Sequence, residues 1–345
     1  MPLRCVDHTT NEDIHAFDLS VDAWQALRTK NGRERHLQMP CCAASVTLKE
    51  SHLGTRFFAH KAVGKCTTAA ETEAHLRLKA MAVEVARAYG WQASTETAGT
   101  TPSGEPWIAD VLAQKGDQRI AIEIQWSRQS NDETMRRQER YESSGIRCLW
   151  LLRHDGFPIT QRLPAACIEG SASDGFLAVV PTRSEEQRME ARAFLEAAFS
   201  RRLRFGVPIG HTATVSARVA PMDCWSCGAE TKFVTGFSVT FGPHMCEFTV
   251  PEIGEYPDLC ELALHKLPTN LGLGPIERRF STTQARSYMS NGCAHCGALI
   301  GEFYEIYARD DEYVVCSFPI TLSERWREAI EGDDRHKLGW GVYSG

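Results

Sequence analysis

The sequence lacks any run of about 18 consecutive apolar residues, the length that a transmembrane helix needs. Residues 1–20 also lack the apolar core of an export signal, because Arg4, Asp7 and Glu12 interrupt them. We therefore expect a cytoplasmic protein without a membrane span. Low-complexity segments and internal repeats are absent as well, apart from two short Cys-x-x-Cys-Gly units.

The chain also lacks an excess of positive charge, since its formal net charge is −6. A nucleic acid would therefore find no general electrostatic attraction to it. Local basic segments could supply that attraction, and Arg136, Arg137 and Arg140 lie together in one predicted helix. A solvated helix face explains such a cluster equally well.

With 345 residues, of which 43% are hydrophobic, the chain is long enough for several globular domains. The clearest pattern begins with a helix predicted at residues 69–89, where apolar residues recur at helical spacing from Leu78 onward. Thr68 and Glu71 have the spacing of a capping box, and Gly90 stands where a C-cap glycine would.

Further elements follow this helix in a regular order. They are three strands at 91–97, 107–113 and 119–126, a helix at 131–143, and a buried strand at 148–152. The order αβββαβ predicts an α/β (α+β) core. A helix at 184–200, a Cys-rich β region to about residue 320 and an amphipathic tail helix near 322–331 complete the prediction.

Two carboxylates are predicted to meet on adjacent strands of this core. Alternation places Glu123 and Gln125 on one polar face. A turn of two or four residues before that strand would place Asp110 opposite Glu123 or Ala121, on the same face. Converging carboxylates suit Mg²⁺ or Mn²⁺, which can polarise a phosphodiester and activate a bound water. Alternatively, Glu123 is an edge or solvent-facing residue.

Segments over residues 33–205 resemble the competence protein CoiA-like family. They are FFAHK (57–61), ETEAHL (71–76), ADVL (109–112), EIQWS (123–127) and GIRCLWLL (145–152). The resemblance implies a PD-(D/E)xK, restriction-endonuclease-like nuclease that processes incoming DNA. It also implies that Asp110 and Glu123 bind the metal, that Gln125 occupies the third catalytic motif, and that Glu71 reaches the same site.

The first helix offers further candidates. Glu71 lies seven residues before Leu78, on the buried stripe, which favours a catalytic role, but it is also placed to cap the helix, and both interpretations stay open. His75 and Lys79 follow at one-turn intervals toward the edge of the apolar face. There either could contact a phosphate or remain a boundary residue.

The sequence departs from the resemblance in two ways. Gln125 stands where a lysine is usual, and a neutral amide stabilises less charge, although Lys79 could compensate. The residues before Asp110 also include no basic side chain. We predict that Gln138 and Tyr141 support the site. Weak catalysis, or catalysis activated by a translocation or motor protein, is the alternative.

Two Cys-x-x-Cys-Gly units predict one closed, structural Zn²⁺ site. Its ligands are Cys224, Cys227, Cys293 and Cys296. Because the chain has 13 cysteines and no export signal, metal binding is favoured over disulfides. Independent redox pairs are the alternative, but neither unit has a thioredoxin-like βαβ context.

A second zinc site could form in the N-terminal part of the chain. Its candidate ligands are Cys41, Cys42, His60 and Cys66. The adjacent cysteines lack the usual knuckle spacing. His60 could instead line the nuclease cleft or pack as a core histidine.

The predicted domains follow these patterns. They are a β-rich Cys/His module (1–66), a PD-(D/E)xK nuclease-like domain (67–182), a bridging helix (183–206), a zinc-ribbon-like domain (207–320) and a C-terminal tail helix (321–345). We predict a metal-dependent deoxyribonuclease for single- or double-stranded DNA, active on incoming or foreign DNA, with DNA contacts from Lys79, Arg136, Arg137 and Arg140. The alternatives are a zinc-containing DNA-binding or scaffold protein with a weakly active nuclease fold, and a redox protein.

Overall fold

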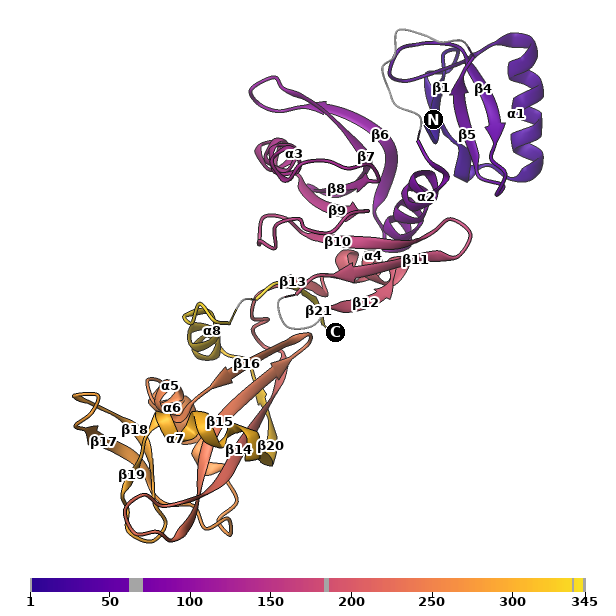
Figure 1. The fold of residues 1–345 in the computed structure, drawn as a ribbon. Helices are drawn as coiled ribbons and strands as arrows, with labels where there is room; N and C mark the ends of the chain where they lie inside the picture. The colour runs from indigo at the N-terminus through magenta and orange to yellow at the C-terminus, as the bar shows by residue number, and fades with distance from the viewer. Residues whose placement is uncertain (1, 62–70, 183–185, 337, 344–345) are drawn as a thin grey trace. The chain divides into compact units, whose positions relative to one another are not determined.

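The computed structural model describes residues 2–61, 71–182, 186–336 and 338–343. The chain divides into two compact units (Figure 1). The first comprises Met1–Pro181, Glu186–Leu203 and Val342–Gly345, and the second comprises Thr182–Glu185 and Arg204–Gly341. Within the described ranges, no helix is both long enough and apolar enough to cross a membrane.

The first unit begins with a small α/β module. Its elements are β1 (Arg4–Asp7), β2 (Glu12–His15), α1 (Val21–Glu34), β3 (Leu37–Gln38), β4 (Val46–Glu50) and β5 (Arg56–His60). β1 lies between β2 and β3, and β4 pairs with β5. The helix α1 was not predicted, because only Trp24 and Asn31 of its residues are buried and its apolar periodicity is therefore weak.

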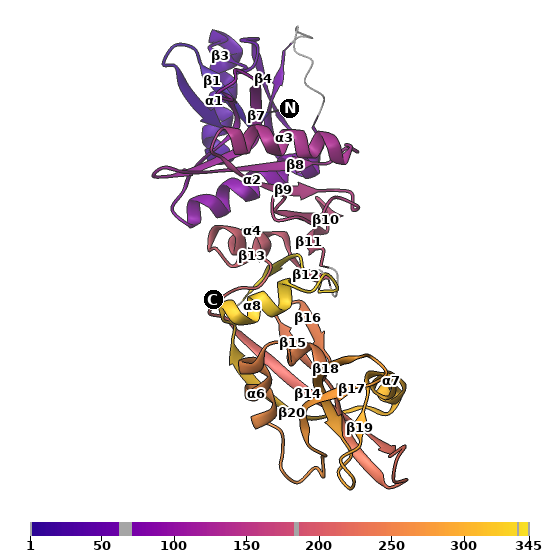
Figure 2. The ribbon, with the colours of Figure 1, turned by 90° about the vertical axis from the view of Figure 1, so that its left-hand side faces the viewer.

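A seven-stranded mixed sheet forms the rest of the first unit, in the order β12-β11-β10-β9-β8-β7-β6. Its strands are β6 (Gln92–Thr100), β7 (Pro106–Lys115), β8 (Gln118–Gln125), β9 (Arg147–Leu152), β10 (Ala165–Ser171), β11 (Gly175–Val180) and β12 (Gln187–Glu190). β9 runs parallel to both β8 and β10. The helices are α2 (Glu73–Ala88), α3 (Asn131–Ser143) and α4 (Ala191–Phe199). Figures 1 and 2 show α2 and α3 on opposite faces of the sheet.

The predicted order αβββαβ is confirmed by α2, β6, β7, β8, α3 and β9. The start of the first helix is corrected. Its N-cap is Thr72, whose hydroxyl accepts a hydrogen bond from the His75 N–H at 3.3 Å. Glu71 therefore precedes the helix and is not its capping glutamate, while Thr68 lies outside the described residues. At the other end, Gly90 has φ +77°, as a C-cap glycine requires.

The turn between β7 and β8 fixes the register that the site depends on. Lys115 pairs with Gln118, so the turn has two residues, and Val111 pairs with Ile122. The next residues along the two strands are Asp110 and Glu123. The two-residue turn therefore meets the condition for placing Asp110 at the level of Glu123.

The helix predicted at 184–200 is shorter in the structure. Residues Gln187–Glu190 form the edge strand β12, which pairs with β11, and among residues 186–200 the helix comprises Ala191–Phe199. This helix, α4, packs against α2 within the first unit. Its buried residues, such as Phe194 and Leu195, stabilise the large sheet's own core.

The second unit contains a four-stranded sheet in the order β16-β15-β14-β20 and a three-stranded sheet in the order β17-β18-β19. The strands are β14 (Thr212–Asp223), β15 (Glu230–Phe241), β16 (His244–Phe248), β17 (Ile276–Ser281), β18 (Arg286–Gly292), β19 (Leu299–Ile300) and β20 (Tyr313–Thr321). The helices are α5 (Val250–Ile253), α6 (Pro257–His265), α7 (Glu302–Tyr307) and α8 (Glu324–Glu331). The short strands β13 (Leu203–Phe205) and β21 (Trp340–Val342) pair with each other.

The helices α5, α6 and α7 were not predicted within the Cys-rich β region between residues 207 and 320. These helices are too short for a helical periodicity of apolar residues to be recognised in the sequence. In addition, α5 and α6 each have a proline in the first turn. The tail helix is confirmed as α8, which begins after the N-cap Ser323. The fold is therefore a mixed α/β fold with a cysteine cluster toward the C-terminal part of the chain.

Candidate active site and metal centres

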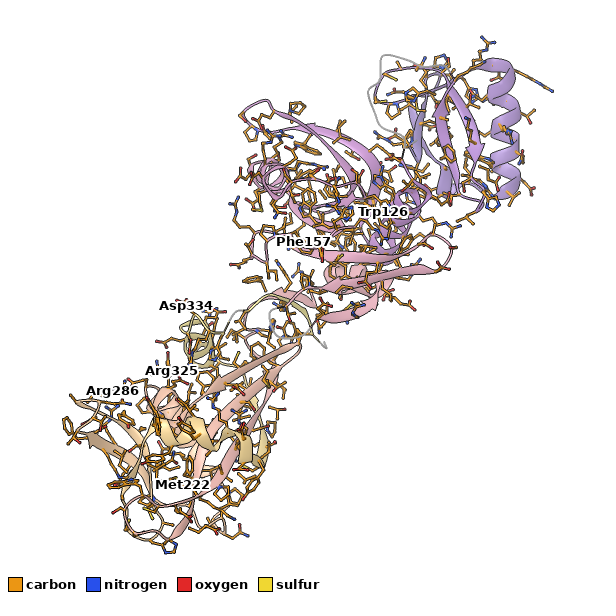
Figure 3. All side chains as sticks on the ribbon, in the orientation of Figure 1. Trp126, Phe157, Met222, Arg286, Arg325 and Asp334 are labelled. Carbon is orange, nitrogen blue, oxygen red and sulfur yellow. The ribbon has the colours of Figure 1, made fainter. Side chains whose placement is uncertain are left out.

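The candidate active site lies where β7 and β8 separate. Beyond the Val111–Ile122 pair, the carboxylate of Asp110 replaces a backbone partner and accepts a hydrogen bond from the Ile124 N–H at 2.9 Å. The side chain is thereby held between these two interior strands, within reach of groups from α2. Figure 3 shows the side chains of this unit and labels Trp126, the residue that follows β8.

Three potential metal ligands converge at this point. One ligand atom each from Glu71, His75 and Asp110 lies within 4.8 Å of the other two. The Nε2 atom of His75 is 3.3 Å from Asp110 Oδ2, and its Nδ1 atom is 3.8 Å from Glu71 Oε1. Two carboxylates and one imidazole form a donor set that a divalent cation such as Mn²⁺ accepts.

Lys79 lies next to this group. The prediction that it is a boundary residue at the edge of the apolar face was wrong, because its side chain is buried. Its side chain is 1% exposed, and its ammonium contacts Glu71 at 2.5 Å, Glu96 at 2.8 Å and Asp110 at 3.3 Å. Three carboxylates compensate for the loss of water around the charge. Because of this burial, Lys79 is not placed to contact DNA from the surface.

The electrostatics of Asp110 follow from these neighbours. Burial alone would raise its pKa, but Lys79, His75 and the Ile124 N–H outweigh burial and hold the pKa well below its usual range. Asp110 is therefore ionised at neutral pH. An ionised carboxylate is the form that binds a metal.

Glu123 is also buried, at 1% exposure, but its contacts come from the other face of the sheet. Arg137 and the hydroxyl of Tyr141, both on α3, donate hydrogen bonds to its two carboxylate oxygens. Burial and the negative charge of Asp110 raise the pKa of Glu123 to about 7, against the opposing effects of Arg137 and Tyr141. Both oxygens of Glu123 are therefore engaged by α3, and Glu123, a predicted metal ligand, does not belong to the group of Glu71, His75 and Asp110.

Gln125 and Arg137 form one connected group. Arg137 donates to Gln125 Oε1 at 3.2 Å and to Gln129 Oε1 at 3.3 Å, and its guanidinium lies 5.2 Å from the ring centre of Trp150. The amide nitrogen of Gln125 donates to the carbonyl of Ser127 at 2.8 Å. Gln125 therefore positions Arg137, and its neutral amide is directed to Ser127 and Arg137 instead of to Asp110.

The other predicted helix residues divide between the interior and the surface. Gln138 is buried and accepts a hydrogen bond from the Trp150 indole at 2.8 Å, while Tyr141 contacts Glu123. Arg136 is exposed and paired with Glu133, and Arg140 lies 3.4 Å from Glu105. The three arginines therefore do not form one basic face, because Arg137 points inward.

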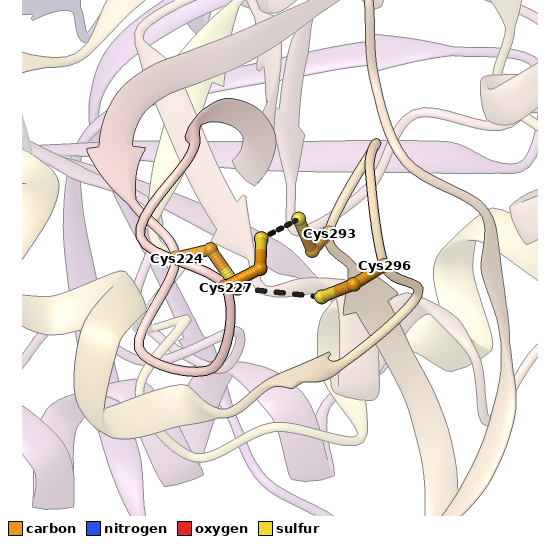
Figure 4. A group of neighbouring side chains, drawn as sticks. All are labelled: Cys224, Cys227, Cys293 and Cys296. Atoms are coloured by element: carbon orange, nitrogen blue, oxygen red, sulfur yellow. Dashed lines mark hydrogen bonds between the residues drawn. The ribbon is translucent and has the colours of Figure 1, made fainter.

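The two Cys-x-x-Cys-Gly units meet in the second unit, as Figure 4 shows (Figure 4). The sulfurs of Cys224 and Cys296 are 3.7 Å apart, those of Cys227 and Cys293 are 3.8 Å apart, and all four fit within 4.8 Å. A tetrahedral Zn²⁺ with Zn–S bonds of about 2.3 Å requires sulfurs about 3.8 Å apart. The distances fit a shared metal ion and are far too long for disulfides, whose S–S length is about 2.0 Å.

Backbone groups complete both knuckles in the same way. The N–H of Ser226 donates to Cys224 Sγ at 3.4 Å, and the N–H of His295 donates to Cys293 Sγ at 3.3 Å. The glycines after the units have φ of +71° and +72°, so each turn adopts a conformation that other residues rarely do. Such N–H···S contacts stabilise thiolates.

The four thiols influence one another's ionisation. Burial opposes ionisation of Cys293, but the N–H groups of Cys296 and His295 lower its pKa to about 6. The N–H of Ala229 favours ionisation of Cys227, yet burial and the three neighbouring thiols raise its pKa to about 12. The first thiolate of the cluster therefore forms more readily than a second one.

A third group of potential ligands lies in the N-terminal module. Cys41 and Cys42 occupy the turn before β4, and His60 ends β5. Their ligand atoms lie within 4.8 Å of one another, and Cys42 Sγ is 3.2 Å from His60 Nε2. Cys66, the fourth predicted ligand, lies outside the described residues.

Sequence reasoning missed two residues at the active site. The sequence gives no indication of Glu96, on β6, and it indicates His75 only as a phosphate contact or a boundary residue. A usable signal existed for Lys79, which lies three residues after Leu76 and four before Val83, within the buried stripe of α2. No comparable local signal marks Glu96.

Residues 71–162 match the family model described as "Competence protein CoiA, nuclease-like domain". No curated protein matches the chain. The matched segment begins at Glu71 and includes His75, Lys79, Glu96, Asp110 and Glu123, so it spans the whole candidate active site.

Proposed function

Because residues 71–162 form a CoiA nuclease-like domain, we propose that the protein is a metal-dependent nuclease that hydrolyses DNA phosphodiester bonds. The observation that carries the proposal is the convergence of Glu71, His75 and Asp110 at the point where β7 and β8 separate. Two carboxylates and an imidazole fit a divalent cation, and the backbone at Ile124 orients Asp110.

Each side chain has a distinct part in this proposal. Glu71, His75 and Asp110 hold Mg²⁺ or Mn²⁺, which would polarise the phosphodiester and supply an activated water. Glu123 adds negative charge next to Asp110, and Arg137 and Tyr141 keep its carboxylate in place. Gln125 positions Arg137.

DNA, single- or double-stranded, is the proposed substrate, and incoming or foreign DNA is its proposed source. Arg136 and Arg140 are exposed or half-buried on α3 and could approach a phosphate backbone once their pairs with Glu133 and Glu105 open. A translocation or motor protein that delivers the strand is the proposed partner.

We further propose that the four-cysteine cluster binds a structural Zn²⁺. The sulfur distances fit tetrahedral coordination, and a closed set of four protein ligands leaves no position for substrate. A second Zn²⁺ at Cys41, Cys42 and His60 is proposed on the same basis, from three ligand atoms within 4.8 Å. Both ions would stabilise small β-rich segments.

One observation favours a second candidate function. The oxygens of Glu123 are both engaged by α3, and Gln125 directs its amide toward Ser127 and Arg137. A zinc-containing DNA-binding or scaffold protein with a weakly active nuclease fold would have these features.

A cleavage assay separates the two functions. Labelled single- and double-stranded DNA is incubated with the zinc-loaded chain and Mn²⁺ or Mg²⁺, and the wild type is compared with Asp110→Asn and Glu71→Gln. Loss of a metal ligand should reduce cleavage by more than ~100-fold, since outer-shell changes alone cost about 10- to 100-fold. Asp117→Asn, in the exposed β7–β8 turn, is the matched control and should cleave normally.

The opposite results are equally clear. Cleavage that persists in both variants removes the assignment of Asp110 and Glu71. DNA binding without cleavage by the wild type, at any metal concentration tested, supports the scaffold function instead.

A further inference from the structure

The ammonium of Lys79 lies within a group of carboxylates. It is surrounded by three carboxylate oxygens, one each from Glu71, Glu96 and Asp110, at 2.5, 2.8 and 3.3 Å. The side chain is buried, so water does not screen these contacts. No other lysine among the described residues is buried.

Asp110 divides its two oxygens between two neighbours. Oδ1 faces the ammonium of Lys79, whereas Oδ2 faces His75 at 3.3 Å and accepts the hydrogen bond from Ile124. In two-metal sites a carboxylate commonly bridges ions about 3.5–4 Å apart. In Asp110 one oxygen already faces a cation, the Lys79 ammonium, and the other faces His75.

Glu96 is held toward Lys79 by an unusual backbone. It has φ +48° inside β6, although its neighbours Thr95 and Thr97 pair regularly with Val111 and Ala109. A left-handed conformation in a strand is costly for a residue with a side chain, and such positions cluster at functional sites. The second oxygen of Glu96 is buried and has no hydrogen-bond partner among the described residues.

The carboxylates around Asp110 outnumber the cationic side chains that contact them. Glu71, Glu96, Asp110 and Glu123 are four carboxylates, and Lys79 and Arg137 are two cations that contact them. Two negative charges therefore remain when all four carboxylates are ionised. One divalent cation balances them, and a second would leave a buried excess of positive charge.

We infer that Lys79 is a built-in second cation, so that the active site accepts one divalent metal ion, next to Glu71, His75 and Asp110, and not two. The inference rests on the proposed nuclease site and specifies its metal stoichiometry. Glu96 is a positioning residue that holds the Lys79 ammonium. A covalently attached cation cannot be lost by dilution or chelation, so Lys79 and Arg137 keep two of the site's four positive charges when no metal is bound.

The test counts Mn²⁺ ions bound by the full-length, zinc-loaded chain. Free Mn²⁺ is followed by electron paramagnetic resonance during titration, which requires no cleavage. The wild type should bind one Mn²⁺ per chain, and Asp110→Asn should bind none. Lys79→Met, which keeps the length of the side chain and removes the charge, should bind two.

The outcomes decide the inference separately from the proposed function. Two Mn²⁺ ions on the wild type, no Mn²⁺ on the wild type, or one Mn²⁺ on folded Lys79→Met would each overturn it. If Lys79→Met lacks the far-ultraviolet circular dichroism of the wild type, Lys79→Gln is titrated in its place with the same expectation. A protein that binds one Mn²⁺ but cleaves no DNA would retain the inference and remove the nuclease function.

Discussion

Replacing Arg137 by methionine should destabilise the first unit, because the carboxylate of Glu123 would remain buried without its cation. Glu123 is 1% exposed, and the Arg137 side chain is 24% exposed. Removing one partner of a buried ion pair typically costs about 3–5 kcal/mol. Since Tyr141 still donates to Glu123 and Arg137 is partly solvated, we expect a loss of about 2–3 kcal/mol.

The neighbouring Arg136 provides a matched control on the same helix. Its side chain is 63% exposed and pairs with Glu133 at the surface. Surface pairs contribute about 0–1 kcal/mol, so Arg136→Met should cost less than about 0.5 kcal/mol. Urea unfolding of the full-length chain, followed by circular dichroism, measures both variants under identical conditions.

The effect of Arg137→Met should also depend on pH in a definite direction. The pKa of Glu123 is raised in the folded protein, from 4.5 to about 7, so its favourable contribution is present below about pH 4.5 and lost as pH rises through 7. Without the guanidinium, the folded pKa rises further. The difference in unfolding free energy between variant and wild type should therefore be nearly constant below about pH 6 and grow as the pH rises through about 7.

A double variant isolates the pair itself. Glu123→Gln combined with Arg137→Met removes both charges, and its loss should be smaller than the sum of the two single losses by more than about 1 kcal/mol. If Arg137→Met costs no more than Arg136→Met, or if the double variant is additive, Arg137 does not stabilise Glu123. Arg137 would then be free to contact DNA, as first predicted.

Two further perturbations test the second unit. Cys293→Ser should lose one zinc ion per chain, and hydrogen exchange at both knuckles should become at least ~100-fold faster. Cys260→Ser, which lies outside the cluster, should change neither the zinc content nor the exchange rate. If Cys293→Ser retains its zinc, the four-cysteine site is excluded. Burial lowers the pKa of His244 from 6.5 to about 4. As the pH falls through this range, His244 is protonated in the unfolded chain but stays neutral in the folded chain, which favours unfolding. The free energy of unfolding of the second unit should fall by about 2–3 kcal/mol between about pH 7 and about pH 4.5, as measured by hydrogen exchange of β15 and β16. If the free energy of unfolding of His244→Gln falls with pH as steeply as that of the wild type, His244 is not the cause.

The central fold could be predicted because its signals are local. The Lys115-Gly116-Asp117 segment indicates a tight turn, and strand alternation then fixes which residues of β7 and β8 meet. That reasoning brings Asp110 level with Glu123 before any coordinates are known. The helix α3 was equally predictable, since Ser130 caps it and Gly145 follows its end.

Glu96 and His75 could not be assigned in the same way. Glu96 reaches the site because β6 pairs with β7 beyond the 101–105 loop and adopts a positive φ at that one residue. Neither fact has a sequence signature. For His75, periodicity shows which face of α2 it occupies but not which strand lies beneath that face. The short helices α5 and α7 could not be predicted either, because helices of fewer than two full turns show no periodicity of apolar residues in the sequence.

The position of Lys79 accounts for the glutamine in the third motif. The resemblance to PD-(D/E)xK nucleases leads one to expect a lysine at Gln125, on β8, yet the Gln125 side chain is directed to Ser127 and Arg137. Lys79 enters the carboxylate group from α2, on the opposite face of the sheet from α3. A second ammonium at Gln125 would join Arg137 and Lys79 around Glu123 and Asp110 and would leave too little negative charge for a divalent cation. The neutral amide and the buried lysine are therefore parts of one electrostatic arrangement.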